Sequence, residues 1–160
     1  MTKQTVNLGI DEAKRKEIAK KLSVFLADTF SLYFKTHAFH WNVTGPHFHT
    51  LHLMLEEQYR ELWAAVDIIA ERIRALGEYS PSTLTDFLEL SSLSETTGVP
   101  DADKMLSDLL SDHEKVIVFA RKSCALAAES GDDASADLLT QRLQVHEKTA
   151  WMLRSFLEKN

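Results

Sequence analysis

Four long segments with helical hydrophobic periodicity constrain the fold of this chain more than any other feature. In each segment apolar residues recur at intervals of three and four, the spacing of one buried face of an α-helix. Only three prolines and five glycines occur in 160 residues, which favours long helices over a turn-rich β fold. The stripe of the last segment shows the rhythm without a break: Leu139, Leu143, His146, Ala150, Leu153 and Leu157.

Residues that end or begin helices separate these segments. The run from Asn42 to Pro46 follows the first segment, and Gly77 follows the second. Pro100 precedes the third segment, and Gly131 ends it. The predicted helices cover approximately residues 11–38, 48–76, 101–130 and 133–157.

The connection between the second and third helices, residues 77–100, is the only long one, and a short helix over 84–90 is expected within it. One long crossover at this place is typical of a ferritin-like four-helix bundle. We therefore predict an all-α fold with a single domain over residues 11–158, preceded by a short N-terminal tail over 1–10.

Composition excludes several classes of protein. No run is long and apolar enough to span a membrane, and the first residues lack the apolar stretch of a secretory signal. The single cysteine, Cys124, excludes an internal disulfide, fits a reducing cytoplasm and is expected to serve packing. A net charge of −6 argues against a generic nucleic-acid-binding protein, although residues 1–22 carry six basic and three acidic side chains.

Two pairs of side chains in the second helix have the spacing of metal ligands. His52 and Glu56 lie one helical turn apart, and so do Asp67 and Glu71. Imidazole nitrogen combined with carboxylate oxygen suits iron, zinc or manganese. Each pair taken alone could equally be a solvated helix face.

The distance between the pairs determines what kind of site they can form. Fifteen residues separate them, roughly 22 Å along one helix. They cannot hold one metal cluster within a single chain. An antiparallel pairing of two copies of this helix, centred near residue 61, would set His52 and Glu56 of one copy beside Asp67 and Glu71 of the other.

The second helix is also apolar outside its main stripe, which indicates a partner surface. Met54, Trp63, Ile68 and Ala70 lie off the stripe. A helix that is apolar on more than one side is buried against something beyond its own bundle. Two-fold pairing with another copy of the chain is the simplest explanation.

The other histidines lack this pattern. His52 alone among seven has an acidic residue one turn further on. His113 and His146 are therefore expected to be core or surface histidines, and so are His47 and His49 near the loop. No histidine follows a glutamate by three residues, the spacing that a diiron bundle uses to build its site inside one chain, so the site is expected at an interface.

The stretch from His40 to Phe48, then His52 with an acid four residues on, then Asp67-Ile-Ile-Ala-Glu71-Arg-Ile, resembles the signature of the Dps family, the miniferritins. The resemblance covers nearly the whole chain. It implies a hollow homododecamer with a ferroxidase site for two irons at each two-fold interface, where zinc is a possible substitute. His40, His52 and Glu56 would come from one subunit, and Asp67 and Glu71 from its mate.

The resemblance also implies roles for other positions. Glu56 departs from the aspartate more usual there, which puts one of the two iron positions in doubt. Trp41 would lie near the irons, where it serves packing or quenches a stray oxidising equivalent. Asp133 and Asp137 match the acidic residues of the iron entry pore, although acidic side chains also stabilise a helix N-terminus.

The expected function is oxidation of Fe(II), preferably with hydrogen peroxide, and storage of Fe(III) inside the shell, which protects DNA. Two alternatives remain open: a nucleoid-binding protein with secondary iron chemistry, and a structural bundle that holds zinc. The tail offers only Lys3 for binding DNA, and twelve chains together would be strongly acidic. The basic run that could touch phosphates consists of Lys14, Arg15, Lys16, Lys20 and Lys21.

Overall fold

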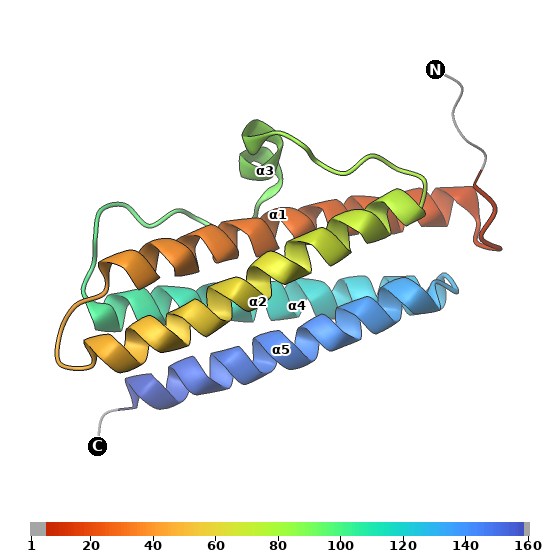
Figure 1. Cartoon of the computed structure of the whole chain (residues 1–160). Coiled ribbons are helices and arrows are strands. Elements are labelled where there is room, and N and C mark those ends of the chain that lie inside the picture. The colour runs from red at the N-terminus through yellow and green to blue at the C-terminus, as the bar shows by residue number, and fades with distance from the viewer. Residues whose placement is uncertain (1–5, 159–160) are drawn as a thin grey trace.

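The computed structural model describes residues 6–158 and contains, over that range, five helices and no strands (Figure 1). Helices α1 (Glu12–Asn42) and α2 (Phe48–Ala75) form one antiparallel hairpin. Helices α4 (Ala102–Glu129) and α5 (Asp133–Leu157) form the second. The short helix α3 (Leu84–Leu90) lies in the crossover between the hairpins and packs on α1. The predicted all-α bundle with a helix in its long crossover is confirmed.

Aspartate side chains begin three of the long helices. Asp11 accepts hydrogen bonds from the first backbone N–H groups of α1, Asp101 does so for α4, and Asp132 does so for α5. These acceptors satisfy N–H groups that have no partner within the helix and place a negative charge at the positive end of its dipole. Thr83 and Asp86 form a capping box at the start of α3.

Helix α1 extends to Asn42, four residues beyond the prediction. The residue before a proline is disfavoured in helical conformation, so Pro46 forces the chain out of the helix only near Gly45. Residues 39–42 contain no breaker and therefore continue the helix. As a result His40 is held on a regular helix rather than in a loop.

The predicted stripes form the core between the hairpins. Most residues of these stripes are buried, and the half-buried side chains of Tyr33, Val66 and Leu157 pack against the margin of the core. No helix within the described residues is long and apolar enough to cross a membrane. Among the largest fully buried side chains are Phe25, Ile18, Leu22, Leu26, Leu55, Leu62, Ile69 and Ile73.

The prediction of a basic surface along the start of α1 is wrong at Arg15. Its side chain is buried and donates a hydrogen bond to the carbonyl of Leu76 at the end of α2. Val6 packs beside it over Gly77. Arg15 therefore ties α1 to α2 and is not available to a phosphate. Residues 1–5 of the predicted tail, including Lys3, lie outside the described residues.

Candidate metal centre

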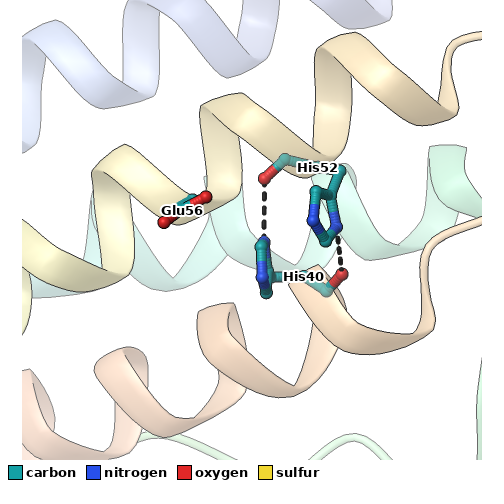
Figure 2. A group of neighbouring side chains, drawn as sticks. All are labelled: His40, His52 and Glu56. Carbon is teal, nitrogen blue, oxygen red and sulfur yellow. Dashed lines mark hydrogen bonds between the residues drawn. The ribbon is translucent and has the colours of Figure 1, made fainter.

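The site is built around two histidines that hold each other in position. His40 near the end of α1 donates from Nδ1 to the carbonyl oxygen of His52, at 2.8 Å. His52 in the first turns of α2 donates in the same way to the carbonyl of His40, at 2.9 Å (Figure 2). The two rings stack with their centroids 3.8 Å apart. This reciprocal pair couples the two helices and fixes both rings.

The reciprocal bonds also decide which nitrogen remains available. A carbonyl oxygen can only accept, so each Nδ1 carries the proton in the neutral ring. Each Nε2 is then left with its lone pair, the form in which imidazole binds a metal. Hydrogen bonding of the second ring nitrogen to a carbonyl is also the arrangement that orients metal-binding histidines in general.

Glu56 completes a three-residue group. One ligand atom from each of His40, His52 and Glu56 lies within 4.8 Å of the others, and they form the one such group of three or more within the described chain. His40 is buried, whereas His52 and Glu56 are half-buried. Two nitrogen donors and a carboxylate at the protein surface fit a divalent transition metal and leave part of its coordination sphere open.

Arg60 forms an ion pair with the carboxylate of Glu56. Its Nε and Nη2 both donate to Oε1, at 2.9 and 2.5 Å. The hydrogen bond from Arg60 holds the pKa of Glu56 below its ordinary value, and His40 and His52 contribute in the same direction. Glu56 is therefore ionised at neutral pH, as a metal ligand must be.

Asp67 and Glu71 lie further along α2 and are both exposed. The structure of one chain does not bring them to the histidine group. Trp63 and Ile68 lie in the same part of the helix and are each 56% exposed. Trp63 and Ile68 are thus uncovered in the single chain, as the sequence predicted, whereas Met54 and Ala70 pack partly against the core.

Comparison with known proteins identifies the family. The ferritin-like domain family matches residues 19–160. DNA protection during starvation protein 2 of Bacillus anthracis is 39% identical over 144 residues, which cover 90% of this chain and 99% of that protein. The chain belongs to the Dps family of ferritin-like proteins.

A further relative and a solved structure match this chain over nearly its whole length. A low temperature-induced protein of Nostoc sp. is 41% identical over 155 residues, or 96% of this chain and 87% of the relative. The crystal structure of Dps from Vibrio cholerae O1 aligns with a TM-score of 0.92 at 28% identity. It covers 99% of this chain and all of that one, and is described as a member of a broad superfamily of ferritin-like diiron-carboxylate proteins.

The acidic residues proposed for the pore of this Dps chain lie at the start of α5. Asp133 and Asp137 are both exposed, and Asp137 accepts a hydrogen bond from Gln141. Asp132, which precedes them, is buried and accepts from both Arg72 and the N–H of Ser135. The sequence did not single out Asp132, which anchors the exposed pair to α2.

His113 and His146 have the structural role predicted for them. Both are buried between α4 and α5, where their Nδ1 atoms lie 3.0 Å apart and share one proton. Burial lowers the pKa of His113 to about 3 and also lowers that of His146. Both rings are therefore neutral, and neither belongs to the group of candidate metal ligands.

Aromatic rings surround the outer side of the histidine pair, and sequence reasoning missed most of them. Tyr59 stacks on His37 at 3.8 Å and lies edge-on to His40 at 5.2 Å. Trp41 is 57% exposed and contacts His37, with ring centroids 4.3 Å apart. Tyr59 and Arg60 could have been recognised from their spacing, because each lies one turn after Glu56.

Proposed function

We propose that this protein oxidises Fe(II) at centres shared between two subunits and stores the product as Fe(III). The observation that carries the proposal is the reciprocal hydrogen bonding of His40 and His52, which leaves two Nε2 lone pairs beside the carboxylate of Glu56. In that arrangement the two imidazole donors are oriented before a metal arrives, so their rings need little rearrangement on binding.

The second half of each centre is proposed to come from a partner subunit. The midpoint of residues 52 and 71 on α2 coincides with the midpoint of 56 and 67, so one two-fold axis near Glu61 serves all four ligands. Exposed Trp63 shares the helix face between the two pairs and supplies apolar surface for the contact. Two equivalent centres per pair of subunits follow from this symmetry.

The proposed reaction uses iron as the substrate. Two Fe(II) ions held close together give one electron each to one molecule of hydrogen peroxide, which takes up two protons and leaves as two waters. A lone Fe(II) would transfer a single electron and release hydroxyl radical. The carboxylates of Glu56 and of the partner's Asp67 and Glu71 favour the harder Fe(III) product. The chain's role is to position both ions and to hold their charge.

Storage is proposed to take place inside a shell of twelve subunits, the assembly implied by family membership. Asp133 and Asp137 are proposed to line the route by which iron enters. Their exposure and their position at one end of the bundle support this role. An acidic pore would concentrate Fe(II) by electrostatic attraction.

The first experiment measures ferric absorbance after Fe(II) and hydrogen peroxide are mixed anaerobically. We expect His52→Ala and Asp67→Ala each to slow oxidation by about tenfold or more, because each removes a ligand. His49→Ala is the matched control, since His49 is exposed on the same helix but outside the group. Wild-type rates in both ligand variants would contradict the proposal.

A structural zinc site predicts a different result in the same assay. Zinc has no redox chemistry, so a structural zinc protein would bind zinc without oxidising iron, and His52→Ala and Asp67→Ala would weaken zinc binding without changing an already slow iron oxidation. Slow iron oxidation by the metal-free protein, together with a stable zinc complex, would support that alternative.

DNA binding is the second candidate function, and the basic side chains at the start of α1 favour it. Lys14, Lys16, Lys20 and Lys21 are exposed, and twelve copies would add avidity. Protection of DNA could then combine iron removal with direct contact. A gel shift with supercoiled DNA at physiological salt, lost in a Lys14→Gln/Lys20→Gln variant, would support binding.

A further inference from the structure

In the metal-free chain, Arg60 forms an ion pair with Glu56, the carboxylate of the candidate metal centre. Its Nε and Nη2 converge on the same oxygen, Oε1 of Glu56. The guanidinium also lies over the ring of Tyr59, 5.8 Å from its centroid. The Arg60 side chain is 68% exposed and makes its ion pair within one turn of α2.

The charge balance of the proposed centre explains why this contact is favourable. An empty centre would hold three carboxylates: Glu56 and, from the partner subunit, Asp67 and Glu71. Like charges held this close repel one another. A guanidinium on Glu56 offsets one of them for as long as no metal is bound.

The length of the glutamate side chain makes the contact possible. Glutamate followed four residues later by a basic residue is the favourable order for an ion pair on a helix. An aspartate at position 56, shorter by one methylene group, would reach less far towards Arg60. The ion pair thus accounts for two features together: position 56 holds a glutamate instead of the aspartate more usual in the family, and an arginine follows four residues later.

We propose that Arg60 is a displaceable counter-cation: it neutralises Glu56 while the centre is empty, yields the carboxylate to an incoming divalent cation, and returns when the cation leaves. The inference rests on the proposed metal centre. Because Arg60 and the cation compete for Glu56, Arg60 lowers metal affinity and favours release of the product towards the store. Removing the arginine should therefore tighten metal binding, whereas removing a ligand should weaken it.

The test is calorimetric titration of the metal-free assembled protein with zinc alone at low salt. We expect Arg60→Gln to bind zinc about two- to fivefold more tightly than wild type, the range for loss of one competing ion pair. Arg60→Lys should fall between the two, because a lysine keeps the charge but not the paired donors. The matched control, Arg121→Gln, removes an exposed arginine that pairs with Glu147, on a helix that carries none of the proposed ligands, and should leave affinity unchanged.

Salt provides a second readout that a merely structural role would not change. The difference between wild type and Arg60→Gln should shrink as salt is raised to about 0.5 M, because screening weakens the ion pair. Equal or weaker zinc binding by Arg60→Gln overturns the inference while leaving the metal centre intact. Absence of zinc binding in the wild-type protein would instead remove the metal centre and the inference with it.

Discussion

The buried pair His113 and His146 is the clearest case in which single residues set a property of the whole chain. Both rings are held neutral in the folded protein because burial lowers the pKa of each, that of His113 to about 3. In the unfolded chain each pKa returns to about 6.5. The unfolded state therefore binds more protons than the folded state below that pH, and stability must fall as the pH is lowered.

This difference can be measured as a slope. Between about pH 6 and pH 4, His113 should contribute about 1.4 kcal/mol of lost stability per pH unit. We expect urea unfolding of a His113→Leu variant to show a correspondingly shallower pH dependence than wild type, whatever its stability at pH 7. Equal slopes would mean that His113 is already protonated in the folded protein.

Among the helices, the contact between the start of α1 and the end of α2 depends on one glycine. Gly77 has a φ of +86°, and a Cβ placed there would lie 2.7 Å from Cγ2 of Val6 and 2.8 Å from Nη1 of Arg15. The contact with Val6 involves a short, inflexible side chain, and Arg15 is itself buried and bonded to Leu76. Neither Val6 nor Arg15 can move aside for a Cβ at position 77 without loosening the end of α2.

A pair of glycine variants separates backbone strain from crowding. Gly131 has a similar φ of +74° but no atom within 4 Å of the corresponding Cβ position. We expect Gly131→Ala to cost about 1 kcal/mol through its backbone alone, and Gly77→Ala to cost about 2–4 kcal/mol because crowding adds to strain. Chemical denaturation of both variants measures the difference, and equal costs would show that the contact between the start of α1 and the end of α2 repacks freely.

At the scale of the whole molecule, the proposed centre exists only when subunits pair. The exposed side chain of Trp63 lies between the two half-sites on α2, on the surface that pairing would cover. Introducing a charge there would oppose burial without altering any ligand. Assembly and metal binding should therefore be lost together.

This coupling can be tested by light scattering and zinc binding on the same samples. Wild type should form a particle of about twelve subunits of 18.2 kDa, whereas Trp63→Glu should be smaller and should bind zinc weakly. The control, Trp151→Glu, changes a tryptophan that is 60% exposed on α5 and should keep zinc binding. A Trp63→Glu variant that binds zinc as wild type does would show that the centre is complete within one chain.

Much of the fold was predictable because helices are local. Apolar spacing located four long helices, and capping residues and breakers located their ends to within a few residues. The end of α1 was placed too early, because residues 39–42 contain no helix breaker and the last turn is also held by the hydrogen bonds between His40 and His52, which lie in different helices. The prediction that Arg15 is exposed with the rest of the basic run was wrong, because Arg15 donates a hydrogen bond to Leu76, which lies far along the chain.

Local patterns located the helices and the two ligand pairs on α2, because both follow from intervals of three and four, and the single long crossover indicated how the helices pack. The folded structure was needed to show that His40 and His52 hold each other's rings, which nitrogen each leaves for a metal, and that Arg60 pairs with Glu56 when no metal is bound. These features escape a sequence pattern because hydrogen bonds and ion pairs depend on directions and distances between side chains. Those are set by packing, and a sequence pattern specifies only the face on which a side chain lies.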